Sequence, residues 1–323
     1  MRRVFAVAAT LLSLASPALA DSVTVPALKQ FGEPRFQPGF THFPHVNPDA
    51  PKGGAVTLAE RGSFDSLNGL ILRGVRPRTL GLISDALMVG SGWELDAAYG
   101  ALAESVELPD DRSWAVFTLR KEARWHDGVP LTAQDVVFTW DMIQAHGAPF
   151  IKSFLDHIAK VEALDDRRVK ITLTGTGEIK PIIDFAVTLA PQPKHWWTAN
   201  GRDISKTILE PPLGSGPYRI KAVDAGRSIT YERVADYWGK DLPTSRGFHN
   251  FRSVKVDYYR DDDVMFEAFK AGAYDFRGEY RAQRWSTGYD FPAAKDGRIL
   301  KIEVPSELPL GAQGFRMNTR RAK

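Results

Sequence analysis

The chain has 323 residues, with 42 Lys and Arg against 39 Asp and Glu, and it contains no cysteine. This length is enough for about two domains, and the lack of cysteine excludes a disulfide framework, a cysteine nucleophile and a lipidated N-terminal cysteine. The near balance of charge gives no basic face for nucleic acid or for a membrane surface.

The first 20 residues have the pattern of a secretory signal peptide. Arg2 and Arg3 form a basic start, residues 4–14 are apolar, and Ala18 and Ala20 are the small residues that a signal peptidase reads. The apolar run is too short to span a bilayer, so a retained anchor is the weaker interpretation. We expect cleavage after Ala20 and a periplasmic protein whose formal net charge falls from +3 to +1 when the two arginines are removed.

Residues 21–55 contain six prolines, which predicts an extended, irregular segment rather than a helix or a central strand. A turn at residues 51–54 leads into a predicted strand over residues 55–59, and residues 62–75 have the composition of a loop. A helix is predicted over residues 79–88, because Leu80, Ile83 and Leu87 recur at helical spacing.

Alternating apolar residues predict a strand near residues 115–119, and a helix follows over residues 133–146. Thr132 is placed to cap this helix, Asp135 stands three residues later as its capping-box partner, and Gly147 ends it. Residues 161–173 read as a hairpin that turns at Asp165 and Asp166.

Several prolines mark a boundary between about residues 191 and 217, after which residues 218–234 predict a hairpin and residues 254–258 a strand. A helix is predicted to start at the acidic residues 261–263, to bury Val264, Phe266 and Phe269, and to end at Gly272. Strands interleaved with helices, without a repeat of fixed period, indicate a mixed α/β or α+β fold.

Residues 125–138, WHDGVPLTAQDVVF, resemble the signature of the family 5 extracellular solute-binding proteins of ABC importers, which bind oligopeptides, dipeptides or nickel. Every position of the pattern is met, from the aromatic residue through Asp-Gly-x-Pro-x-Thr-Ala-x-Asp-Val-x-Phe. A turn, a proline and a capped helix account for these residues physically, so we interpret the signature as architectural and expect the ligand elsewhere.

Other segments resemble the family in the right order, namely residues 214–218, 263–276 and 314–319. The N-terminal residues 31–54 and 62–68 resemble the branch typified by the microcin C and oligopeptide importer component. The resemblance covers the whole chain after the signal peptide.

The resemblance implies a type II periplasmic-binding-protein-like fold. It also implies a binding component for oligopeptides or peptide-like compounds that has no chemistry of its own, uses no cofactor, and works as a monomer with an inner-membrane permease and its ATPase subunits. Family members continue past the strand at residues 314–319 into a second lobe, so we expect an incomplete fold, with the first lobe and a small accessory domain. The expected divisions are a signal peptide at 1–20, first-lobe segments at 21–85 and 206–310, the accessory domain at 86–205, and the start of a crossover at 311–323.

Ligand contacts are expected on three segments of the chain. Arg73, Gly74 and Val75 match a loop that pairs with ligand backbone, although an ordinary turn that needs a positive φ at Gly74 explains them equally well. The remaining candidates are Phe64, Asp65 and Asn68 on the preceding loop and Phe150 and Phe154 after the helix at 133–146. An Asx turn is an equal explanation for Asp65 and Asn68, and packing beneath the helix is the favoured role of the two later phenylalanines.

A metal site at His42 and His45 is disfavoured because no third ligand has a sensible spacing. Residues 261–263 are explained more simply as an acidic helix start than as a cation site. The alternative functions are a secreted hydrolase, for which no Gly-x-Ser-x-Gly or His-Glu-x-x-His motif is present, and a non-functional fragment of a split binding-protein gene. Because one wall of a cleft gives little burial, the chain alone is expected to bind peptide weakly or not at all.

Overall fold

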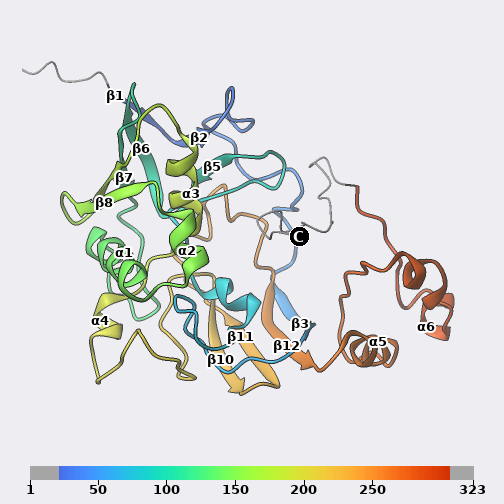
Figure 1. Ribbon diagram of the computed structural model, residues 1–323. Coiled ribbons are helices and arrows are strands. Elements are labelled where there is room, and N and C mark those ends of the chain that lie inside the picture. The colour runs from blue at the N-terminus through green and yellow to red at the C-terminus, as the bar shows by residue number, and fades with distance from the viewer. Residues whose placement is uncertain (1–21, 306–323) are drawn as a thin grey trace, which may run out of the picture.

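The computed structural model describes residues 22–305. The predicted signal peptide at 1–20 and the predicted crossover at 311–323 lie outside the described residues. Within the described part, the strands form sheets of five, four and three strands, and Figure 1 shows the five-stranded sheet with α1, α2 and α3 beside it and the four-stranded sheet below. Over the same residues, none of the helices is both long and apolar enough to cross a bilayer.

The five-stranded sheet is antiparallel and has the order β1-β6-β7-β9-β8. Its strands are β1 (Ser22–Val25), β6 (Ala103–Pro109), β7 (Trp114–Leu119), β9 (Arg168–Leu173) and β8 (Ile158–Ala163). The predicted strand at 115–119 and the predicted hairpin at 161–173 are confirmed, because the β-branched and aromatic residues there alternate between the two faces.

Helices cover one face of this sheet and close the main core. They are α1 (Ala133–His146), α2 (Pro149–Phe154) and α3 (Lys180–Thr188), and the short α4 (Lys194–Trp197) packs against α1. Phe117 of β7 packs against Phe185 of α3 with ring centroids 5.9 Å apart, and both side chains are fully buried. Each such burial contributes about 1.5–3 kcal/mol before the entropic cost of folding is subtracted.

The predicted start and end of α1 are confirmed. Thr132 and Asp135 form the capping box, with the Thr132 N–H donating to Asp135 Oδ2 at 3.0 Å, and Gly147 stands at the C-cap. The carboxylate also accepts hydrogen bonds from the Trp125 indole at 3.4 Å and the Lys194 N–H at 3.0 Å. Asp135 therefore ties the signature turn, α1 and the start of α4 together.

The four-stranded sheet has the order β10-β11-β12-β3, with β12 and β3 parallel and the other pairs antiparallel. Its strands are β10 (Tyr218–Asp224), β11 (Ser228–Arg233), β12 (Phe251–Tyr259) and β3 (Gly53–Arg61). Three predicted features are confirmed here, namely the strand near 55–59, the hairpin at 218–234 and the strand at 254–258. Ile229, Tyr231 and Val256 form the centre of its core and are fully buried.

The smallest sheet has the order β2-β5-β4, with β2 (Ala27–Lys29), β5 (Ala97–Gly100) and β4 (Met88–Val89). Residues 22–55 contain neither a helix nor a central strand, as predicted, but the expectation that they are irregular is wrong where they supply the edge strands β1 and β2. The prolines do confine this segment to short pieces, and both strands lie at the edge of their sheets.

The helix predicted over residues 79–88 is also wrong. The structure has a six-residue 3-10 helix, η1 (Arg78–Ile83), after which the chain is extended at Ser84 and Met88 belongs to β4. The carbonyl of Ile83 accepts a hydrogen bond from the Gly216 N–H at 2.9 Å, instead of the N–H one helical turn ahead. A contact distant in sequence overrides the local helical pattern here.

After β12 the chain forms α5 (Asp262–Lys270), the π-helical turn η2 (Arg284–Gly288) and α6 (Pro292–Lys295). The acidic start is confirmed, since Asp261 caps α5 by accepting hydrogen bonds from the Asp263 and Val264 N–H groups. Phe266 and Phe269 are buried as predicted, but Val264 is 45% exposed. The reason is geometric, because two residues along a helix correspond to about 200°, which places Val264 opposite Phe266.

A buried carboxylate, Asp85, joins η1 and β4 to the loop after β11. Its oxygens accept hydrogen bonds from the Tyr237 hydroxyl at 2.6 Å and the Trp238 indole at 3.1 Å. Burial raises the pKa of Asp85 to about 6, although these hydrogen bonds pull it back in part. A pKa above the ordinary value means that the folded chain binds this proton more tightly than the unfolded chain does.

The Asp85 contribution to stability is complete below the unfolded pKa of 3.8 and is lost as the pH rises through about 6. We expect wild type to lose about 1–1.5 kcal/mol from this group between pH 5 and 8, a loss that Asp85→Asn does not show. Urea unfolding of both proteins at pH 5 and pH 8 measures how much each free energy of unfolding changes with pH. Both proteins contain His126 and His249, so the titration of these residues cancels when the two changes are subtracted. Identical pH dependence in the two proteins would contradict the assignment.

Candidate functional site

The loop at residues 62–75 leaves β3 and is held by the segment at 204–208. The Leu67 N–H donates to the Ile208 carbonyl at 2.7 Å, and the Asn68 side-chain amide donates to the carbonyls of Ile204 at 2.7 Å and Lys206 at 2.9 Å. The Asn68 Oδ1 also accepts a hydrogen bond from the Leu70 N–H at 3.0 Å, which is an Asx turn. Asn68 is buried and holds the loop in place.

The tip of the loop folds back on Asp65. The Val75 N–H donates to Asp65 Oδ1 at 2.6 Å, and the Asp65 N–H donates to the Val75 carbonyl at 3.0 Å. Gly74 has a φ of +88°, and a Cβ at this position would lie 2.8 Å from Ser66 Cβ and 2.9 Å from Thr207 Cγ2. Both the positive φ and the lack of space require glycine here.

This backbone arrangement leaves the tip open to solvent. Leu72 and Val75 are 67% and 58% exposed, and Arg73 is exposed between them. Among the described residues, the N–H groups of Arg73 and Gly74 have no hydrogen-bond partner. Such a row of free donors can pair with the carbonyls of an extended chain.

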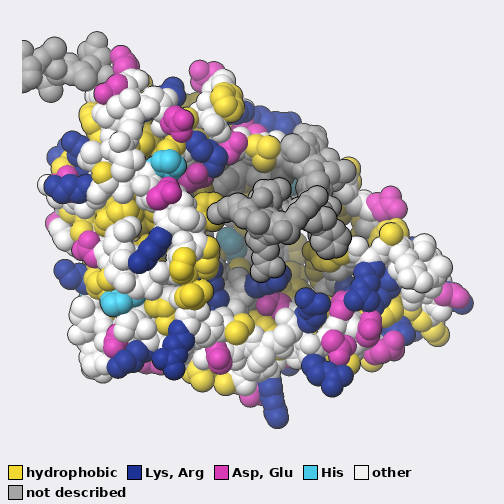
Figure 2. Space-filling model, in the orientation of Figure 1, with side chains coloured by type: hydrophobic (Ala, Val, Ile, Leu, Met, Phe, Trp, Pro, Cys, Tyr) yellow, Lys and Arg dark blue, Asp and Glu magenta, His cyan; other side chains and the backbone are white. Residues whose placement is uncertain are grey.

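Helix α2 lies directly beside this loop. An antiparallel bridge joins Ile71 to Gly147, and the Ala148 N–H donates to the Leu70 carbonyl at 3.0 Å. Phe150 and Phe154 of α2 are 50% and 56% exposed, and the space-filling view shows hydrophobic side chains at the surface over this helix (Figure 2). The favoured expectation that these two rings pack beneath the helix is wrong, because Ile151 and Leu155 fill that role.

A cavity of about 500 Å³ separates the loop and η1 from α1 and α2. Its wall includes Leu70, Ile143 and Phe150, and its cationic residues are Arg76 and Arg78, with no carboxylate side chain in the lining. Arg76 donates to the Gly69 carbonyl, and its guanidinium carbon lies 5.7 Å from the centre of the Phe150 ring. The cavity is thus apolar with a positive rim, which suits an apolar ligand that carries a carboxylate.

The structure therefore separates the predicted contacts into two groups. Arg73, Gly74, Val75, Phe150 and Phe154 lie on neighbouring exposed elements, whereas Phe64 and Asn68 are each 2% exposed. Phe64 packs on the Tyr258 ring with centroids 5.0 Å apart. We therefore expect these two residues, with Asp65, to shape the loop from behind.

Sequence reasoning missed Leu72 and Arg76 as candidates. Leu72 belongs to the quoted loop and could have been chosen for its large apolar side chain, which is 67% exposed. Arg76 carried no signal, because its position over Phe150 depends on the pairing of residues 71 and 147.

The two histidines considered for a metal have other partners. His45 Nδ1 accepts a hydrogen bond from the Trp93 indole at 2.6 Å, and its ring stacks on Phe43. The His42 ring nitrogen contacts the Thr41 hydroxyl at 2.9 Å. Over residues 22–305, no group of three or more His, Asp or Glu side chains is arranged to hold a metal ion.

Comparison with known proteins gives one family match and many relatives. Residues 97–323 match the family model described as bacterial extracellular solute-binding proteins, family 5 Middle. The probable peptide-binding protein YejA of Agrobacterium fabrum is 42% identical over 94% of this chain and 50% of that protein. The chain thus spans about half the length of the curated relatives that it matches.

Two solved structures of binding proteins resemble the fold of this chain. The ABC transporter substrate-binding protein CtaP of Listeria monocytogenes is 28% identical with a TM-score of 0.53, over 69% of this chain and 44% of that one. The periplasmic binding protein DppA of Helicobacter pylori, solved with the peptide STSA, has a TM-score of 0.62 at 22% identity, over 75% of this chain and 50% of that one.

Proposed function

Because the chain belongs to the family 5 bacterial extracellular solute-binding proteins, we propose that it is the substrate-binding component of an ABC importer for oligopeptides or peptide-like compounds. The family and the fold class predicted from the sequence are both confirmed, since the mixed α/β structure resembles type II periplasmic binding proteins. The relative YejA of A. fabrum is named as a probable peptide-binding protein, which supports a peptide ligand here.

The observation that carries the proposal is the surface of the loop tip and α2. Free N–H groups at Arg73 and Gly74 suit the carbonyls of an extended peptide, and the exposed side chains of Val75, Phe150 and Phe154 suit its apolar residues. Backbone pairing gives affinity without fixing the peptide sequence, which an importer of varied peptides needs.

Arg76 and Arg78, which line a cavity without acidic residues, add a place for a peptide carboxylate. A guanidinium with no competing carboxylate nearby is a suitable partner for a chain terminus or an acidic side chain. This charge pattern favours peptides over neutral sugars.

The accessory-domain division stays part of the proposal. We take the five-stranded sheet with α1 to α4 as the accessory domain, with limits near residues 86 and 205, and the four-stranded sheet as the first lobe. One difference from the sequence division is that β1 and β2, from the first-lobe segment, pair with β6 and β5. We further propose a periplasmic location after cleavage at Ala20, a monomer, and a permease with its ATPase subunits as partner.

We expect the chain to bind peptides weakly and to leave them intact. The described residues present one wall for the ligand, and burial on one side gives a Kd of about 0.1–1 mM rather than the affinity of an enclosed pocket. Calorimetric titration with defined peptides measures the affinity, and mass spectrometry of the same samples reports cleavage.

Turnover of the peptide would favour the hydrolase alternative and reject a purely binding role. No detectable binding to any peptide would support the fragment alternative, and nanomolar binding would contradict the one-wall account.

A further inference from the structure

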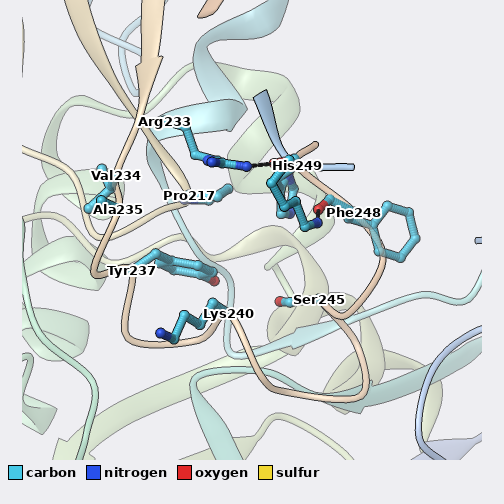
Figure 3. Close-up of a pocket in the computed structure, with 10 residues that line it drawn as sticks. Pro217, Arg233, Val234, Ala235, Tyr237, Lys240, Ser245, Phe248 and His249 are labelled. Carbon is cyan, nitrogen blue, oxygen red and sulfur yellow. Dashed lines mark hydrogen bonds between the residues drawn. The ribbon is translucent and has the colours of Figure 1, made fainter. Parts of the chain in front are cut away.

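A second pocket lies at the end of β11, away from the loop tip and α2. It has a volume of about 220 Å³ and shares no lining residue with the larger cavity. Figure 3 shows Arg233 and His249 on one side of it and Tyr237, Lys240 and Ser245 on the opposite side, with the Phe248 ring directed away from it. The lining is completed by Lys52, Pro217, Val234 and Ala235.

The charges around this pocket are all positive. Lys52, Arg233 and Lys240 line it, and no Asp or Glu does. Arg233 donates to neutral groups, the carbonyls of Asn250 at 3.1 Å and His249 at 3.3 Å. Lys52 donates to the Phe248 carbonyl at 2.6 Å.

The third cation, Lys240, is exposed to solvent. Its ammonium group has no partner within residues 22–305. Elsewhere on the same sheet the arrangement differs, because Arg219 and Lys221 of β10 both pair with Glu232. The pocket therefore has three cations and no carboxylate among its lining residues.

The titration behaviour of the pocket agrees with its geometry. Burial, with a further effect of Arg233, lowers the pKa of Lys52. Burial and then the charge of Lys52 lower the pKa of His249 to about 4, so its ring is neutral at pH 7. A neutral imidazole can still donate one hydrogen bond to an acceptor in the pocket.

The volume of the pocket and the residues of its wall limit the kind of ligand that fits it. The volume of about 220 Å³ lies below the roughly 300–1,000 Å³ of sites for drug-sized ligands, so the occupant is small. Pro217, Val234 and Ala235 give the pocket an apolar wall beside its cations. A simple inorganic ion would leave that wall without a contact.

We propose that this pocket binds a small organic carboxylate, with its charged group among Lys52, Arg233 and Lys240 and its apolar body against Pro217 and Val234. Charge-assisted hydrogen bonds from ammonium and guanidinium groups recognise the carboxylate. The site is separate from the proposed peptide surface, so either proposal can fail while the other stands.

Benzoate is the probe, and benzamide, which has nearly the same shape and no charge, is its matched control. In calorimetric titration of the whole chain we expect saturable benzoate binding with a Kd at or below about 1 mM, and benzamide binding at least tenfold weaker. Lys240→Gln should weaken benzoate binding by about five- to tenfold, since one charge-assisted hydrogen bond is lost.

Lys240→Gln removes the charge without breaking a hydrogen bond or ion pair, because the ammonium group has no partner within residues 22–305. Lys52→Gln should weaken binding similarly. Lys221→Gln on β10, where the ammonium group pairs with Glu232 of β11, should leave binding unchanged. The proposal is overturned if benzoate does not bind, if benzamide binds equally well, or if Lys240→Gln and Lys221→Gln have the same affinity.

Discussion

Asp135→Ala is expected to lower the free energy of unfolding by about 3–5 kcal/mol. Asp135 is 5% exposed, and its carboxylate holds the Thr132 N–H, the Trp125 indole N–H and the Lys194 N–H. Alanine leaves all three donors without this acceptor, and each buried donor without a partner costs about 1–3 kcal/mol.

Urea unfolding monitored by circular dichroism measures this loss. The matched control is Asp127→Ala in the same signature, where the carboxylate is 39% exposed and contacts His195 at 2.9 Å. That change should cost about 1 kcal/mol or less. If the two variants were equally stable, Asp135 would not be the residue that holds the signature turn to its helix.

Gly214→Ala is expected to destabilise the chain by about 3 kcal/mol or more. A Cβ on Gly214 would lie 2.0 Å from the Ile83 carbonyl oxygen and 3.0 Å from His126 Cε1. The first neighbour is backbone and cannot swing away, so η1 and the strand entry at β10 would have to separate. This movement would also strain the hydrogen bond between the His126 N–H and the Gly214 carbonyl, which is 2.9 Å long.

Gly175→Ala is the matched control for this overpacking. A Cβ on Gly175 would meet no heavy atom within 4 Å, and the φ of this residue is not positive. Alanine there should be neutral or should stabilise by up to about 1 kcal/mol, because it restricts the unfolded chain. A Gly214→Ala protein that unfolds at the same urea concentration as Gly175→Ala would contradict the close approach of the two segments.

The elements that the sequence predicted well have strong local signals. The limits of α1 follow from Thr132, Asp135 and Gly147, which act within one or two turns of the helix. The hairpins of β8 with β9 and β10 with β11 follow from alternation on both sides of a turn. These features need no knowledge of distant residues.

The failures have distant causes. The pattern at 79–88 is helical, but the Ile83 carbonyl is used by Gly216, more than 130 residues away. The edge strands β1 and β2 form only because β6 and β5 accept them. Neither pairing can be inferred from the spacing of residues within the segment itself.

The candidate site was predicted in part for the same reason. The loop at 72–75 could be located from its glycine and its resemblance to the family, and Gly74 does need its positive φ. Whether Phe64 and Asn68 face a ligand or the interior depends on Tyr258, Ile204 and Lys206. The exposure of Phe150 and Phe154 likewise depends on Ile151 and Leu155 filling the space beneath α2.

The central claim, that the loop tip and α2 form the surface that meets a peptide, is tested most directly by site-specific photo-crosslinking. The photoreactive residue p-benzoylphenylalanine replaces Phe154 on α2 or, as a control of similar exposure on α5, Val264. Cross-linking captures partners that bind too weakly to survive purification, so it suits a one-walled site.

After illumination with a mixture of defined peptides, mass spectrometry counts the intact peptides joined to each position. We expect labelling through position 154 that an excess of unlabelled peptide suppresses, and little labelling through position 264. Equal labelling at both positions, or none at position 154, would contradict the assignment of this surface to the ligand.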